Sequence, residues 1–95
     1  MQEKLRIIVL DILKPHKPDI IDFGIAIEKE RSVKCLNLSV YAIDEKTESV
    51  KISLEGENLD LKKIKKVIEE QGAVIHSVDK AVIGEKKIIP VPDLR

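Results

Sequence analysis

Ionisable side chains gather where the first apolar segment of the chain ends. Asp11 interrupts the run Leu5–Leu13, and Lys14, His16 and Asp19 follow it within one short stretch that contains two prolines. Carboxylate, ammonium and imidazole groups are side chains that hold polar ligands, and an imidazole titrates near neutral pH. We therefore predict Asp11, Lys14, His16 and Asp19 as the ligand-binding candidates of this sequence.

A divalent cation is an alternative ligand for part of this group. Asp11 and His16, with Asp79 from much later in the chain, offer the oxygen and nitrogen donors that such ions accept. Structural roles explain the same residues: Asp11 can pair with a lysine such as Lys51 on the next strand, and His16 can be an exposed loop residue. No nucleophilic side chain lies at a recognisable motif spacing from a general base, so we expect neither enzymatic activity nor a cofactor.

Hydropathy patterns predict six secondary-structure elements that would position these residues. Strand-like runs alternate or are apolar throughout, whereas helix-like runs repeat apolar residues every three or four positions. The expected elements are a strand at Leu5–Leu13, a helix from Pro18 to about Arg31, strands at Val33–Ile43 and Val50–Glu55, a helix from Asn58 or Asp60 to Gly72, and a strand at Ala73–Ile83. Asp79 and Lys80 interrupt the last strand and predict a bulge there.

This order predicts an α+β domain with the ferredoxin-like split βαβ arrangement (βαββαβ). Two helices would cover one face of an antiparallel sheet, and right-handed crossovers would place the first and third strands in its middle. We expect residues 1–95 to form a single domain. The proline-containing ending, residues 86–95, is expected to be an extended C-terminal arm, because prolines are excluded from central strands.

Composition excludes several functions that this fold can host. RNA-binding versions stack bases on aromatic side chains of the central strands, but aromatics make up 2% of this chain and those strands have none. Metal-carrying versions use a Cys-x-x-Cys pair, and Cys35 is the only cysteine. The equal numbers of basic and acidic residues, 17 of each, argue against nucleic acid as a partner.

The same composition predicts where the protein works. One cysteine fits a reducing cytoplasm, and we expect no membrane partner because no 18 apolar residues run together. Charged residues make up 36% of the chain, and they occur with many isoleucines. This balance is typical of a thermophile, because networks of surface ion pairs contribute more to stability at high temperature.

Apolar residues exceed what a single core with two helices on one side of a sheet can bury. The helix after Pro18 is apolar on more than one face, the first strand is apolar on both faces, and the arm adds further isoleucines. We therefore predict that the protein's partner is itself, in a closed ring or dimer. The interface candidates are Ile7, Val9, Ile21, Ile25, Ile88 and Ile89.

Three segments carry a resemblance to a known family: LDILKPHKPDII, LNLSVYAIDEKTESVKISLEG and IEEQGAVIHSVDKAVIG. The sequence resembles the archaeal domain-of-unknown-function family 211 over about residues 4 to 88. That resemblance implies a ferredoxin-like fold and closed rings of subunits, and it implies no particular activity. We therefore expect an interaction or scaffold protein, or a small-molecule sensor.

The first segment is also similar to the Asp, Pro and Gly signature of ACT domains, which bind amino acids near this loop. Asp19 stands where that signature has glycine. A regulatory ligand-binding module of the ACT type is therefore the alternative function.

Overall fold

The computed structural model describes residues 4–85 and contains the six expected elements in the expected order. They are β1 (Leu5–Pro15), α1 (Ile20–Glu28), β2 (Cys35–Ile43), β3 (Thr47–Glu55), α2 (Leu61–Glu70) and β4 (Val74–Ile83). The expected C-terminal arm, with Ile88 and Ile89, lies outside the described residues.

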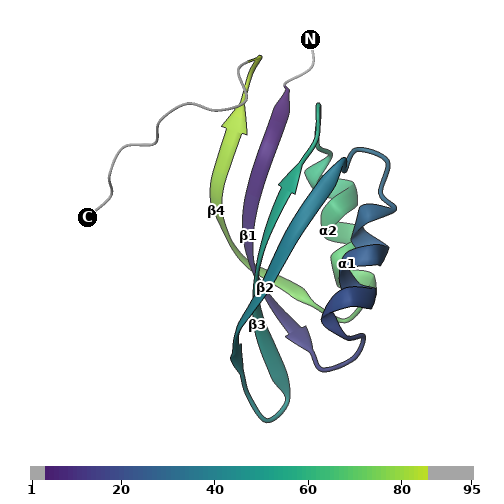
Figure 1. Cartoon of the computed structure of the whole chain (residues 1–95), viewed down its shortest axis with the longest axis vertical. Coiled ribbons are helices and arrows are strands. Elements are labelled where there is room, and N and C mark those ends of the chain that lie inside the picture. Colours follow the sequence, from purple (N-terminus) through teal and green to yellow (C-terminus); the bar gives the residue numbers. More distant parts are fainter. Residues whose placement is uncertain (1–3, 86–95) are drawn as a thin grey trace, which may run out of the picture.

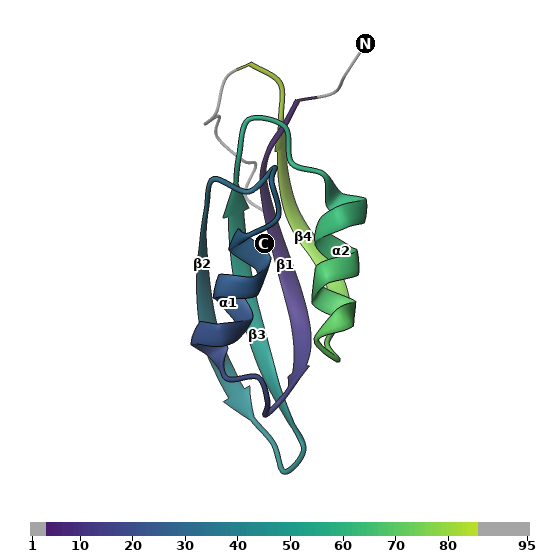
Figure 2. The same cartoon turned by 90° about the vertical axis from the view of Figure 1, so that its right-hand side faces the viewer.

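The four strands form one antiparallel sheet in the order β2-β3-β1-β4. Both helices lie on the same face of this sheet, with α1 against β2 and α2 against β4 (Figures 1 and 2). The first and third strands are central, as the right-handed crossovers predicted. The ferredoxin-like α+β fold is therefore confirmed.

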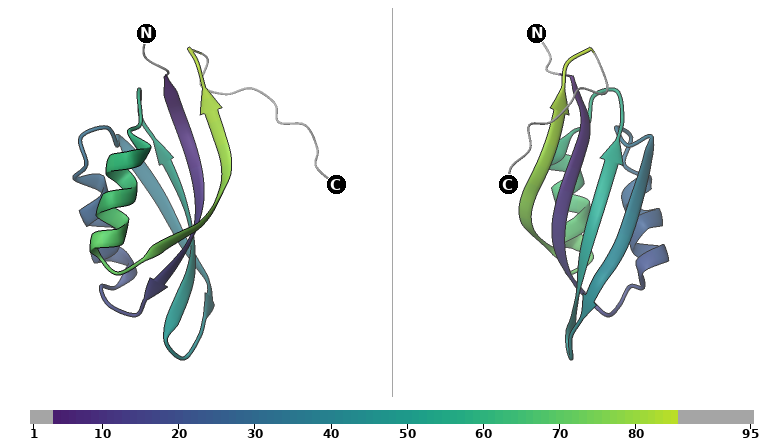
Figure 3. Two further views of the ribbon diagram at one scale, coloured as in Figure 1. Left: turned by 180° about the vertical axis from the view of Figure 1, so that it is seen from behind. Right: turned by 60° about the vertical axis from the view of Figure 1, so that its left-hand side comes forward.

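The core lies between the sheet and the two helices. Alternate residues of β1 point into it, namely Ile8, Leu10 and Ile12, and Phe23 and Ile64 of the two helices pack against them. The opposite face of the sheet has no helix among residues 4–85 and is seen directly in the right-hand view of Figure 3. Ile7, Val9 and Asp11 of β1 lie on this open face, because side chains alternate along a strand.

The helix boundaries follow local capping. Asp19 caps α1 and Asp60 caps α2, each by accepting a hydrogen bond from a backbone N–H three residues later. We expected α1 to reach Arg31, but it ends at Glu28. The Glu30 carboxylate accepts hydrogen bonds from the backbone and the hydroxyl of Ser32, and this turn competes with further helix.

Three strand boundaries differ from the expected ones by two or three residues. β1 continues to Pro15 and β3 begins at Thr47, because the polar hairpin residues still pair across the sheet, as Ile43 does with Glu48. β2 begins at Cys35 rather than Val33. Within residues 4–85 neither helix, at 9 and 10 residues, is long and apolar enough to cross a membrane.

Candidate functional site

The loop between β1 and α1 is built around the buried ammonium group of Lys14. This side chain is 0% exposed, and its Nζ donates hydrogen bonds to the carbonyl oxygens of Pro15, at 2.8 Å, and Pro18, at 2.5 Å. Nζ also lies 3.1 Å from Oε1 of Glu48 and 5.8 Å from the centre of the Phe23 ring. A buried charge is tolerated only when such partners replace water. The loop therefore folds around Lys14.

His16 joins the same loop to the β2–β3 hairpin. Its Nδ1 lies 3.0 Å from Oε2 of Glu48, and its Nε2 lies 2.9 Å from the backbone carbonyl oxygen of Glu45. Both partners are acceptors, and a neutral imidazole donates from only one nitrogen. Both hydrogen bonds therefore form only when His16 is protonated.

The ionisation of the pair follows from this geometry. The hydrogen bond to Glu48 and then the one to the Glu45 carbonyl raise the pKa of His16 above its ordinary value of 6.5. In return, hydrogen bonds from His16 and Lys14 lower the pKa of Glu48 below 4.5. The two contacts thus favour the charged form of each group over its neutral form, relative to the same group in water.

We expect this His16 contact to stabilise the protein in a pH-dependent way. Because the folded-state pKa is raised, the contribution is complete below pH 6.5 and is lost as the pH rises through the folded-state pKa. The pKa of Glu48 is lowered, so its contribution to stability is present above its ordinary pKa of 4.5 and is lost only as the pH falls further into the acidic range. The melting temperature of the parent protein should therefore exceed that of His16→Gln most clearly below pH 6.5, and the difference should shrink as the pH is raised from there to the alkaline side of neutrality.

His76→Gln is the matched control, since it removes the only other histidine of the sequence. The pH dependence assigned to the His16 contact is the part of the His16→Gln difference that His76→Gln does not share. A His16→Gln difference that stays constant over this pH range would contradict the proposed protonated contact.

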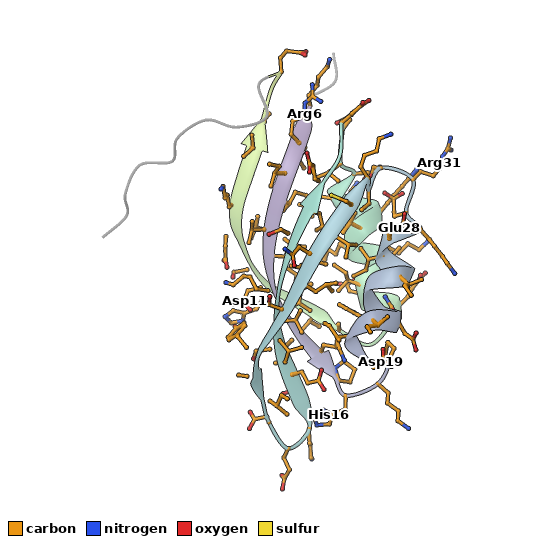
Figure 4. The ribbon with its side chains drawn as sticks, in the orientation of Figure 1. Arg6, Asp11, His16, Asp19, Glu28 and Arg31 are labelled. Carbon is orange, nitrogen blue, oxygen red and sulfur yellow. The ribbon has the colours of Figure 1, made fainter. Side chains whose placement is uncertain are left out.

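Asp19 is also used by the fold itself. Its Oδ1 accepts a hydrogen bond from the backbone N–H of Asp22 at 2.8 Å and so caps α1. Three of the four predicted ligand-binding residues thus lie at the end of β1 or in the loop that follows it and contact the chain's own atoms, namely Lys14, His16 and Asp19. Figure 4 shows that Asp11, the fourth, lies elsewhere.

Asp11 lies on the open face of the sheet within a network of polar side chains. The Tyr41 hydroxyl donates to its carboxylate, with distances of 2.7 and 2.9 Å to the two oxygens. Lys51, its neighbour on β3, lies 3.5 Å away, as the sequence predicted. The Lys51 Nζ is also 2.5 Å from Oδ2 of Asp79, whose Oδ1 accepts a hydrogen bond from the Ser77 hydroxyl at 2.6 Å.

Two bulges bring the edge strands into this network. Val40 pairs with Val50 and Ala42 with Ser49, so Tyr41 is an extra residue in β2. Similarly, Lys80 of β4 pairs with Val9 and Val78 pairs with Leu10, so Asp79 is an extra residue in β4. Bulges redirect side chains, and these two direct Tyr41 and Asp79 toward the central strands. The predicted bulge at Asp79 is confirmed, whereas Tyr41 was not foreseen.

One ammonium group, that of Lys51, offsets part of the acidic charge in this network. Asp79 raises the pKa of Lys51, and Lys51, followed by Ser77, lowers the pKa of Asp79. The Asp11 carboxylate raises the pKa of Tyr41, which therefore stays a hydrogen-bond donor. The network therefore contains two acidic side chains, Asp11 and Asp79, and one basic side chain, Lys51.

The metal candidates are not gathered into one site. Asp11 and Asp79 both contact Lys51, whose ammonium group lies between them, while His16 contacts Glu48 in the loop. Among residues 4–85, no group of three or more His, Cys, Asp or Glu side chains is placed to hold a metal ion.

An apolar cleft of about 400 Å³ lies between α1 and the edge strand β2. Two of the predicted interface residues, Ile21 and Ile25, line it and are 68% and 51% exposed. Its remaining walls are Gly24, Glu28, Lys34, Cys35, Leu36 and Leu38. A methyl group on Gly24 would lie 2.8 Å from Leu38 Cδ1, so the glycine lets α1 approach β2 closely.

The other interface candidates within the described chain lie on the open face. Ile7 and Val9 are partly buried there and line a second hollow, of about 540 Å³, whose other walls include Asn37, Ser53 and Lys80. The four described interface candidates are therefore divided between the α1–β2 cleft and the open face.

Comparison with known proteins places the chain among archaeal relatives. The model of the domain-of-unknown-function family 211, described as "Uncharacterized ArCR", matches residues 6–94. An uncharacterised protein of Methanocaldococcus jannaschii is 46% identical over 84 residues, which are 88% of this chain and 87% of that protein. This chain therefore belongs to the archaeal domain-of-unknown-function family 211.

Proposed function

We propose that this protein is a homo-oligomeric interaction or scaffold protein, whose copies associate through the α1–β2 cleft and the open face of the sheet. The observation that carries the proposal is the exposure of Ile21 and Ile25, which stand side by side on α1 above apolar residues of β2. Neighbouring apolar side chains of this size rarely stay in water on a monomer's surface.

The two helices show the contrast within one molecule. The exposed positions of α2 are all charged, namely Lys62, Lys63, Lys65, Lys66, Glu69 and Glu70. Helix α1 packs Phe23 and Ile27 into the core and still presents Ile21 and Ile25 outward. Complete burial of an isoleucine contributes about 1.5 to 3 kcal/mol relative to exposure. Association can bury the two exposed isoleucines of α1, whereas the exposed positions of α2 hold no apolar side chain to bury.

Exposed apolar residues also occur elsewhere on residues 4–85. The remaining large ones are Leu13, Tyr41, Ile43, Val74, Val78 and Ile83. A ring of three or more copies needs more than one contact surface per copy, because each copy meets two neighbours. A ring of subunits is therefore the form of assembly that we propose.

The loop geometry favours assembly over the ACT-like alternative. A ligand at the β1–α1 loop would have to compete with the chain's own contacts at Lys14, His16 and Asp19. Asp19 is the helix cap at the position where a glycine would let a ligand approach the backbone. A small-molecule sensor of the ACT type is thus less well supported than a scaffold.

Substitution of Ile25 tests the proposed surface. Ile25→Asp places a charge in the α1–β2 cleft, and we expect it to shift the sedimentation profile of the protein toward smaller species. The control is Lys65→Gln on α2, which changes the net charge by the same amount at an exposed position outside the cleft. Equal assembly sizes for Ile25→Asp and the parent protein would contradict the proposed role of this cleft.

A further inference from the structure

The edge of the sheet beside the α1–β2 cleft is open to another strand. β2 is at one end of the strand order, and no other strand of residues 4–85 pairs with its outer side. Its residues from Cys35 to Val40 pair with β3 in unbroken register. In contrast, β4 at the other edge shows several register shifts, which hinder further pairing. An added strand would therefore meet less obstruction at β2.

The sequence of residues 86–95, KKIIPVPDLR, has the pattern of a strand with one usable edge. Successive residues of a strand point their backbone groups to opposite edges and their side chains to opposite faces. Proline lacks the N–H group, so Pro90 and Pro92 leave one edge without donors, while Ile89, Val91 and Asp93 keep theirs on the other. The face that carries the prolines is apolar from residue 88 to residue 94.

We infer that residues 88–94 of one copy pair with the outer edge of β2 in a neighbouring copy, with this apolar face in the α1–β2 cleft. The inference rests on the proposed oligomer and names the segment that fills the cleft. It accounts for two unpartnered features together: an open strand edge and an apolar cleft lined by Ile21 and Ile25. Strand addition of this kind combines backbone hydrogen bonds with side-chain pockets.

The segment cannot reach the cleft of its own copy. β4 and β2 are at opposite edges of the sheet, three strand spacings or about 14 Å apart. Only three residue steps separate Glu85 from Ile88, and an extended chain covers about 10 Å over that length. The pairing therefore joins different copies, and repetition around a closed ring satisfies every copy.

The charges favour an antiparallel direction. Lys34 stands just before β2, and the acidic residues Asp19 and Asp22 stand at the start of α1 near the other end of the cleft. In an antiparallel arrangement Asp93 approaches Lys34, while the two lysines at the beginning of the segment approach the acidic residues. A parallel arrangement would bring those lysines toward Lys34 instead.

A pair of substitutions in the full chain tests this pairing. Val91→Pro removes an N–H from the edge proposed to face β2, whereas Val91→Ala keeps that N–H and shortens a side chain that points away from the cleft. We expect Val91→Pro to weaken association by about tenfold or more in sedimentation experiments, because lost backbone hydrogen bonds lower the affinity. Val91→Ala should leave the assembly unchanged.

Cross-linking gives a second, independent readout. Cys35 at the start of β2 is the only cysteine, so Asp93→Cys should form a disulfide between copies under mild oxidation and give covalent multimers on a non-reducing gel. Leu94→Cys, on the opposite face of the segment, is the control. A parent oligomer in which Val91→Pro changes nothing and Asp93→Cys does not cross-link would overturn the inference but leave the proposed oligomer standing. A monomeric parent protein would overturn both.

Discussion

Replacing Lys14 with methionine is expected to lower the free energy of unfolding by about 3 kcal/mol, because breaking a buried ion pair leaves its partners uncompensated. Methionine has a similar length but donates no hydrogen bond. The carbonyl oxygens of Pro15 and Pro18 and the Glu48 carboxylate would each lose the donor that now stands within 3.1 Å. The loop before α1 would therefore lose its organising contact.

Urea denaturation of the parent protein and Lys14→Met measures this loss. Lys17→Met is the control, since Lys17 lies in the same loop but is exposed. The control should remain within about 0.5 kcal/mol of the parent, as is usual for surface substitutions. A Lys14→Met protein as stable as the control would show that the buried ammonium is not what holds the loop.

Gly56→Ala is the second substitution expected to have a large effect. A methyl group at this position would lie 2.2 Å from the backbone oxygen of Ser32 and 2.9 Å from Leu59 Cδ2. The Gly56 N–H also donates to the carbonyl oxygen of Arg6 at 2.9 Å, so the glycine cannot simply move away. Overpacking against fixed backbone costs about 1 to 3 kcal/mol, and we expect the upper end of this range.

Gly24→Ala provides the comparison for this prediction. Its new methyl group would meet Leu38 Cδ1 at 2.8 Å, but that atom is the end of a flexible side chain. Alanine is also favoured over glycine inside a helix by up to about 1 kcal/mol. Thermal unfolding should therefore show a much smaller loss for Gly24→Ala than for Gly56→Ala. Equal losses would mean that the backbone near Ser32 yields more easily than its contacts indicate.

The fold was predictable because its signals are local. Residues close together in the sequence predict the alternation along the strands, the Asp60 cap and the order of the elements. The structure confirms all three. The pairing of Asp11 with Lys51 was also predictable, since it requires only that β1 and β3 be neighbours in a suitable register. Asp79 interrupts an apolar strand in the sequence, and this irregularity predicts the bulge that the structure has there.

The candidate site was less predictable because it depends on contacts between distant residues. Lys14 looked like a ligand-binding residue, but the loop carbonyls and Glu48, which lies 34 positions later, surround its ammonium group. Tyr41 reaches Asp11 only because β2 bulges at that point, and alternation alone does not reveal such a bulge. The strand register with its bulge places Tyr41 beside Asp11, and the closure of the loop places the carbonyl groups around Lys14.

The most direct test of the central claim is the molar mass of the full chain, measured by light scattering after size-exclusion chromatography. The mass of one chain is 10.7 kDa. Assembly through the α1–β2 cleft and the open face predicts one well-defined mass at micromolar concentration, equal to this value multiplied by a whole number greater than one. A mass of 10.7 kDa across that concentration range would contradict the proposal that this protein works as an assembly of its own copies.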